Sequence, residues 1–129
     1  MRYISIVAVL AVLQYFFFGV RVGLARGRYG VKAPAVSGHE TFEREFRVHM
    51  NTLEQLVAFL PALFIAGMYW PDAVIAGIGT VYLLGRFVYW RQYVANPASR
   101  GPGFLLTVAP TFILLAAALV GALTRSAVG

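Results

Sequence analysis

The chain has 129 residues, of which 60% are hydrophobic and only 12% charged, whereas a soluble globular domain is about one-quarter charged. A chain this short can bury only part of that apolar surface in a water-soluble core, so the composition excludes an ordinary soluble domain and favours a membrane protein. The net charge of +6 does not indicate a nucleic-acid partner, because the basic residues gather at predicted helix ends instead of covering one face.

The first predicted helix, residues 3–26, opens with an uncharged run from Tyr3 to Val20 that is long enough to cross a bilayer core. An alternative interpretation is a cleaved signal peptide, since Arg2 precedes the run and a small-residue sequence resembling a cleavage site follows it. The run is too long and too aromatic for a typical signal peptide, so we interpret it as a membrane span. A polar loop over residues 27–41 follows it.

The second predicted helix, residues 42–69, has Thr41 as its expected N-cap, a charged first half and an apolar second half. The third, residues 73–94, begins with small side chains that allow close contact between helices in lipid. The fourth, residues 102–123, is uncharged throughout. The sequence therefore predicts an all-α fold, an integral membrane bundle of four helices that forms a single domain over residues 1–129.

The basic residues predict how these helices are oriented. All but two of the 11 Lys and Arg residues fall at or near the loops that join the first helix to the second and the third to the fourth. Only Arg2 and Arg125 lie at the other end. Because basic loops stay on the cytoplasmic side, we expect both termini on the opposite side of the membrane. The abundance of Ala, Val, Gly and Arg suggests a bacterial origin and so a bacterial inner membrane.

Two polar stripes interrupt the apolar pattern of the second and third helices. At about 100° per residue, each set shares one narrow face of its helix: Glu43, Arg47, Asn51 and Glu54 on the second, and Tyr82, Arg86, Tyr89 and Tyr93 on the third. Ionisable groups at membrane depth are costly and need a partner or a function. One interpretation is that the charged residues of the stripes form ion pairs with one another, Glu43 with Arg47 and Glu54 with Arg86. The excess of basic over acidic residues at this end favours an anionic ligand instead, because arginine binds carboxylates bidentately.

His49 points to the opposite side of the second helix from Arg47 and Asn51. A lone histidine in such a place is more often a packing or interfacial residue than a ligand group. If His49 belongs to the same site, it must reach that site from a neighbouring subunit. No spacing of His, Asp or Glu indicates a metal centre, and the absence of cysteine means that any reactive thiol must come from a ligand.

The segment from Phe42 to Glu54 resembles the signature of the MAPEG family, the membrane-associated proteins in eicosanoid and glutathione metabolism. The matching pattern, continued by an apolar run that contains Pro61, is E-R-x-x-R-x-x-x-N-x-x-E. A second match lies in the third helix and the loop after it, at Arg86, Tyr89, Tyr93 and Arg100. The resemblance covers nearly the whole chain, including the number and order of the helices.

Family members are trimers of four-helix subunits that bind glutathione between subunits, so the resemblance implies a homotrimer that uses glutathione. The residues that it assigns to glutathione are Arg47, Asn51, Glu54, Arg86, Tyr89 and Tyr93 from one subunit, with Arg26 and His49 from its neighbour. Arg100 matches the arginine that family enzymes place at the thiol and is the expected catalytic residue. A charge-assisted hydrogen bond from Arg100 would stabilise the thiolate, and about 2.7 kcal/mol of such stabilisation lowers a thiol pKa by about two units.

The resemblance therefore predicts a membrane-bound glutathione transferase, or a glutathione peroxidase, whose lipophilic electrophile or lipid hydroperoxide arrives through the membrane lipid. One alternative is a non-catalytic lipid- or glutathione-binding protein of the same fold, against which Arg100 argues. Another is a small multidrug exporter, ranked last because the first helix lacks the carboxylate that such exporters keep. His49 resembles the prostaglandin synthase and transferase branch, whereas the spacing from Arg86 to Arg100 resembles the leukotriene synthase branch. The second substrate therefore stays open.

Overall fold

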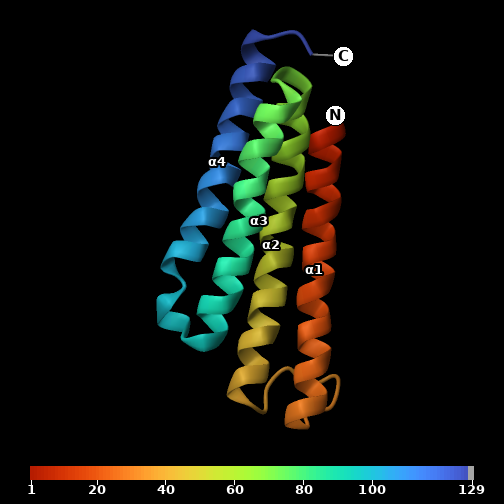
Figure 1. Cartoon of the computed structure of the whole chain (residues 1–129), viewed down its shortest axis with the longest axis vertical. Helices are drawn as coiled ribbons and strands as arrows, with labels where there is room; N and C mark the ends of the chain where they lie inside the picture. Colours follow the sequence, from red (N-terminus) through yellow and green to blue (C-terminus); the bar gives the residue numbers. More distant parts are fainter. Residues whose placement is uncertain (128–129) are drawn as a thin grey trace.

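Four long α-helices follow one another in the computed structural model, which describes residues 1–127. They are α1 (Arg2–Tyr29), α2 (Glu40–Tyr69), α3 (Asp72–Ala95) and α4 (Gly101–Thr124), with a short 3₁₀ turn, η1 (Pro97–Ser99), before α4. The helices run alternately down and up the bundle, so the N-terminus and the end of α4 lie at the same end (Figure 1). Each is long and apolar enough to cross a membrane, as the sequence predicts, although the last two residues of the predicted domain lie outside the described part of the chain.

The helix ends differ from prediction by a few residues, and one predicted cap is wrong. α1 continues past residue 26 to Tyr29, where Gly30 takes a φ of 69° and provides a left-handed C-cap. α2 begins at Glu40 because His39, and not Thr41, is its N-cap. The Nδ1 atom of His39 accepts a hydrogen bond from the Thr41 backbone N–H at 3.1 Å, which is the capping role that serine or threonine usually fills.

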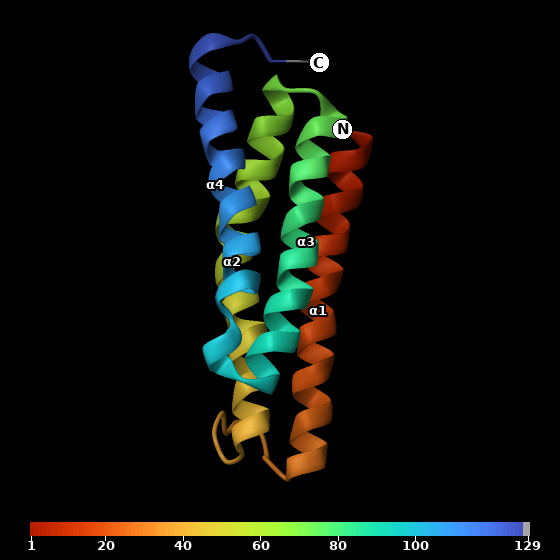
Figure 2. The ribbon, with the colours of Figure 1, turned by 60° about the vertical axis from the view of Figure 1, so that its left-hand side comes forward.

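The bundle is arranged so that α2 and α3 each pack against the other three helices, while α1 and α4 lie at opposite corners. Figure 2 shows α3 between α1 and α4 on one side of the bundle. The apolar core fills the half of the bundle nearer the termini and continues to the stacked rings of Phe59 and Tyr82, whose centroids are 3.8 Å apart. Two aromatic clusters and the polar side chains lie farther toward the opposite end.

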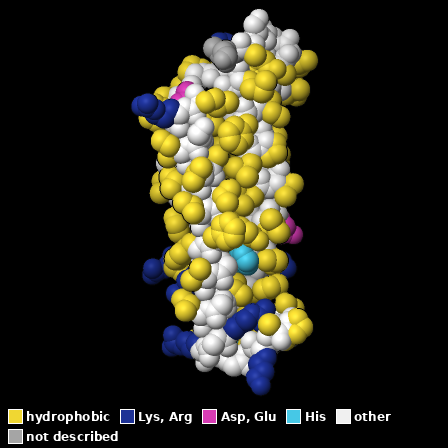
Figure 3. Space-filling model, turned by 90° about the vertical axis from the view of Figure 1, so that its right-hand side faces the viewer, with side chains coloured by type: hydrophobic (Ala, Val, Ile, Leu, Met, Phe, Trp, Pro, Cys, Tyr) yellow, Lys and Arg dark blue, Asp and Glu magenta, His cyan; other side chains and the backbone are white. Residues whose placement is uncertain are grey.

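The outer surface divides the molecule into an apolar belt and a basic end. Most of the large side chains along the outward faces of α1 and α4 are hydrophobic and exposed. Figure 3 shows most of the visible Lys and Arg side chains gathered at the lower end, below a largely hydrophobic surface. This is the surface expected of a protein whose middle faces lipid and whose basic loops face water. We refer to the end that holds the loops 30–39 and 96–100 as the basic end.

Candidate functional site

Arg86 of α3 lies inside the bundle, and its side chain is fully buried. Its Nη2 donates to the hydroxyl of Thr52 at 2.8 Å, its Nη1 lies 3.4 Å from the hydroxyl of Thr107, and its guanidinium carbon lies 4.4 Å from the centre of the Tyr89 ring. Within residues 1–127 no carboxylate pairs with Arg86, and its Nε has no hydrogen-bond partner. A buried cation is costly without a counter-ion, so this site holds positive charge that the described chain does not neutralise.

Thr52 and Thr107 do not belong to the predicted stripes, yet they are the direct partners of Arg86. Each hydroxyl also donates to the carbonyl four residues earlier in its own helix, at 2.7 Å for Thr52 and 2.9 Å for Thr107. The hydroxyl oxygen is thereby left as an acceptor for the guanidinium. The signal that could have found them is a buried hydroxyl in a helix that is otherwise apolar at that depth.

Tyr89 joins the predicted polar side chains of α3 into one cluster. Its ring stacks on that of Tyr93, with centroids 5.5 Å apart and planes at 16°. The structure therefore brings together the predicted residues Arg86, Tyr89 and Tyr93 of α3.

Close packing of α3 against α4 places Arg100 near this cluster. A Cβ atom on Gly103 would lie 2.4 Å from the backbone of Tyr89, so only glycine permits this approach of the two helices. The side-chain oxygen of Gln92 accepts from the Gly103 backbone N–H at 3.3 Å and holds the same contact. Arg100 is exposed at the end of η1, where its Nη1 donates to the Pro97 carbonyl at 3.1 Å.

An open cavity of about 430 Å³ lies beside Arg100 and is lined also by Ala98, Gly101 and Phe104. Arg100 provides a cation on one wall of this cavity, and Phe104, which is 43% exposed, provides an aromatic ring on another. Because α4 is uncharged and faces outward, the cavity opens next to the apolar belt of the bundle. Its lining suits a group that is partly anionic and partly apolar.

On α2, the predicted residues Arg47 and Glu54 are exposed, and Asn51 between them is half-buried. The side-chain oxygen of Asn51 is buried and has no partner within residues 1–127. Exposed charged groups at this depth would face lipid in a single chain, which is unfavourable. These three side chains are therefore left open for a ligand or a second chain.

The interpretation in which the two stripes neutralise each other is wrong for the single chain. Glu43 accepts a hydrogen bond from the Gly38 backbone N–H at 3.1 Å and forms no ion pair with Arg47. Glu54 forms none with Arg86. The ion pairs that do occur within residues 1–127 join Arg21 to Glu45, Arg44 to Glu40, and the N-terminal amine to Asp72.

His49 and Arg26 lie between α1 and α2, and the single chain does not bring them to the cluster around Tyr89. The His49 ring stacks on Tyr15 of α1, with centroids 4.5 Å apart. Arg26 donates to the Ala35 carbonyl at 2.6 Å, and its guanidinium carbon lies 4.8 Å from the centre of the Phe42 ring. None of these contacts within the described residues joins His49 or Arg26 to the Tyr89 cluster.

Comparisons with known proteins show which family the chain resembles. The model of the MAPEG family matches residues 4–120, which begins inside α1 and ends inside α4. Microsomal glutathione S-transferase 2 of Homo sapiens is 36% identical over 120 residues, covering 93% of this chain and 80% of that protein. Leukotriene C4 synthase of Cavia porcellus is 32% identical over 122 residues, covering 95% and 81%. An uncharacterized protein of Synechocystis sp. is 40% identical over 119 residues, covering 92% and 87%.

Proposed function

The chain is an integral membrane protein that belongs to the MAPEG family, and on that premise we propose that it is a glutathione transferase that activates the glutathione thiol for attack on lipophilic electrophiles. With a lipid hydroperoxide as the second substrate, the same thiolate would attack the outer oxygen and break the O–O bond, which releases the lipid alcohol. A second glutathione would reduce the resulting sulfenic acid, giving glutathione disulfide and water. The observation that carries the proposal is the buried Arg86, whose charge no carboxylate within residues 1–127 neutralises. Relatives named as a glutathione S-transferase and a leukotriene C4 synthase support the same chemistry.

Glutathione offers a complementary group for each open side chain. Its two carboxylates suit the cations Arg47 and Arg86, since arginine binds carboxylates bidentately. Its ammonium suits Glu54, and its peptide N–H groups suit the buried, unpartnered oxygen of Asn51. Tyr89 and Tyr93 add two stacked phenol rings, and the guanidinium of Arg86 lies over the ring of Tyr89. A single anionic ligand would thus satisfy groups that the chain leaves unsatisfied.

Arg100 is the proposed catalytic residue because it lines the cavity at the start of α4, where Gly103 packs against the backbone of Tyr89. A guanidinium beside the thiol would favour the thiolate, and the thiol proton would leave to water. The thiolate sulfur would then form a bond to the electrophilic carbon of the second substrate. The bond broken at that carbon would give its electron pair to the leaving group, or to the oxygen of an opened epoxide, which would take a proton from water. Phe104 provides an apolar wall for that substrate, which would arrive from the membrane lipid.

The proposed assembly is a homotrimer with equivalent sites between subunits. Its support is the placement of His49 and Arg26 on the α1–α2 side, away from the Tyr89 cluster. A neighbouring subunit would add these residues to the site and would cover the exposed charges of Arg47 and Glu54. The cost of exposing those charges to lipid would then be avoided.

We also propose that the basic end faces the cytoplasm of a bacterial cell, with both termini on the far side of the inner membrane. The support is that nine of the 11 Lys and Arg residues lie in or near the loops 30–39 and 96–100 (Figure 3). Reporter fusions after residue 129, which lies outside the described residues, and within the loop 30–39 should report opposite sides. Equal signals from the two fusions would contradict this orientation.

Ultraviolet absorbance of bound thiolate tests the proposed function. Purified protein in detergent should show thiolate absorbance when glutathione is added near neutral pH. Arg100→Ala should lose that absorbance and should conjugate about tenfold more slowly, or slower still, because each 1.36 kcal/mol of lost stabilisation is a factor of ten. Raising the pH should restore part of the rate, since the thiol then ionises unaided.

The matched control is Arg125→Ala, which removes the same charge at the opposite end of the bundle and should leave both the absorbance and the rate unchanged. Glutathione affinity should be nearly intact in Arg100→Ala, because other residues hold the tripeptide. Binding of glutathione without thiolate and without turnover in the wild type would favour the non-catalytic binding protein instead.

A further inference from the structure

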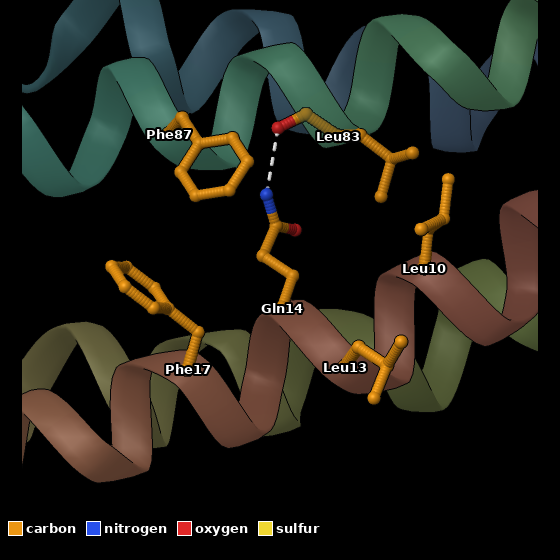
Figure 4. A pocket seen from close by; sticks show the side chains of 6 residues that line it. All are labelled: Leu10, Leu13, Gln14, Phe17, Leu83 and Phe87. Carbon is orange, nitrogen blue, oxygen red and sulfur yellow. Dashed lines mark hydrogen bonds between the residues drawn. The ribbon is translucent and has the colours of Figure 1, made fainter.

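An apolar groove lies on the seam between α1 and α3, and none of the candidate site residues lines it. Its volume is about 310 Å³, and its walls are Leu10, Leu13, Gln14, Phe17, Leu83 and Phe87. Figure 4 shows Gln14 reaching from α1 to α3 with apolar side chains on both sides of it. The Nε2 of Gln14 donates to the Leu83 carbonyl at 2.8 Å, so this bond fixes the spacing between the two walls.

A second cavity, of about 350 Å³, lies on the same seam nearer the basic end. It is lined by Arg21, Glu45, Trp90, Arg91, Val94 and Ala95. Because α1 and α3 run in the same direction toward that end (Figures 1 and 2), the side chains of the second cavity follow those of the groove on both walls. Arg21 comes four residues after Phe17, and Arg91 four residues after Phe87, which is about 6 Å along each helix. The groove and the cavity therefore lie end to end.

The second cavity carries an excess of positive charge. The buried carboxylate of Glu45 accepts from Nη2 of Arg21 at 3.2 Å and from Nε1 of Trp90 at 3.1 Å, so it already has its partners. Arg91 is exposed and forms no ion pair within residues 1–127, and the Nε of Arg21 has no partner there. Two guanidinium groups and one carboxylate leave one positive charge open to an anion.

We propose that this seam binds an anionic phospholipid, with its phosphate at Arg91 and Arg21 and one acyl chain along the groove beside Gln14. From Leu10 to Arg21 the seam is about 16 Å long, which matches the thickness of about 15 Å for the hydrocarbon of one leaflet. The charged cavity lies at the basic end, where lipid headgroups would be, and the groove extends toward the middle of the bundle. A zwitterionic lipid would bring its own ammonium next to the arginines and would bind less well.

Native mass spectrometry of the intact protein in detergent tests this proposal with phosphatidylglycerol and phosphatidylcholine of identical acyl chains. The wild type should retain phosphatidylglycerol in preference. Arg91→Gln should reduce that binding by about fivefold, the effect of removing one basic residue near a membrane surface, and should leave phosphatidylcholine unchanged. Arg2→Gln, which removes the same charge at the other end of the bundle, should have no effect.

Leu13→Trp provides a second test, because its ring would fill the groove from an exposed position. This variant should lower the retention of both lipids without changing the number of chains per particle. An unchanged preference for phosphatidylglycerol in Arg91→Gln would overturn the proposal. So would displacement of the lipid by inorganic phosphate alone, which would mean that the groove takes no part. A change in the number of chains in either variant would show that the seam contacts a second copy, and the proposal would then be wrong.

Discussion

The two ends of the helix bundle differ in how completely their polar groups are hydrogen-bonded. At the end that holds the termini, Asp72 pairs with the N-terminal amine at 3.2 Å and accepts from the Tyr3 backbone N–H at 2.9 Å. There the Nε1 of Trp70 also donates to the Ala117 carbonyl at 2.7 Å. These contacts join α1 to α3 and α2 to α4, so the chain completes its own hydrogen bonding at this end.

Toward the basic end the polar groups remain incomplete. Among residues 1–127, the buried side-chain atoms without a hydrogen-bond partner lie at the middle of the bundle or closer to the basic end, in Gln14, Arg21, Asn51, Tyr82 and Arg86. Buried polar groups are normally satisfied, so such a cluster needs an explanation. In the proposed account, the terminal end closes the bundle by its own contacts, whereas a ligand or another chain would complete the basic end.

The largest expected effect comes from removing the buried charge at the basic end. Arg86→Met should lower glutathione affinity by about ten- to a hundredfold, because it removes a charge-assisted contact. The ligand-free protein should keep its thermal stability or gain some, since an apolar side chain of similar length replaces an uncompensated buried cation. Equilibrium dialysis and thermal unfolding measure the two quantities. The control, Arg86→Lys, keeps the charge without the planar fork and should bind glutathione with an intermediate affinity.

A smaller effect, a partial recovery of activity, should appear when two inactive variants are mixed. It tests whether a second chain contributes residues to the site at the basic end. Arg26→Ala and Arg47→Ala should each be nearly inactive alone, because each removes one side of every site. Co-expressed at equal levels and assembled at random, they should regain activity in about one-quarter of the sites, where each chain supplies its intact half. No recovery in mixed particles would place both residues in the same subunit's site, and activity of Arg26→Ala alone would place Arg26 outside it.

The smallest effect is expected at the terminal end. Asp72→Asn weakens the contact with the N-terminal amine and should slightly lower the temperature of unfolding, because this pair is partly exposed to solvent. Glutathione affinity and the conjugation rate should stay at wild-type values. A loss of glutathione binding in Asp72→Asn would contradict the proposal that only the basic end binds the ligand.

The sequence predicts the fold well because apolar runs of bilayer length, broken by polar loops, allow few alternatives. The polar stripes are also predictable, since the helical period places Arg86, Tyr89 and Tyr93 on one face. Helical periodicity shows which residues share a face but not how deeply each is buried. It therefore could not predict that Arg86 is fully buried while Arg47 is exposed. Depth depends on which helices touch.

Two further features were beyond the reach of the sequence for the same reason. Thr107 meets Arg86 only because Gly85 and Gly103 let α3 and α4 approach so closely that a Cβ on either would clash with the backbone of the other helix. The contact of Glu45 with Trp90 likewise joins α2 to α3, and no short-range pattern predicts it. The sequence does not predict the N-cap at His39 because a ring nitrogen there accepts the hydrogen bond that a serine or threonine hydroxyl usually accepts.

Thermal unfolding of the wild-type protein in detergent, with and without glutathione, tests most directly the claim that an anionic ligand completes the basic end. A ligand that binds only the folded state at about one hundred times its dissociation constant stabilises it by about 2.7 kcal/mol. Glutathione should therefore raise the temperature of unfolding, and glutathione with both carboxylates esterified should raise it much less. Equal shifts with the two compounds, or no shift with either, would contradict the claim.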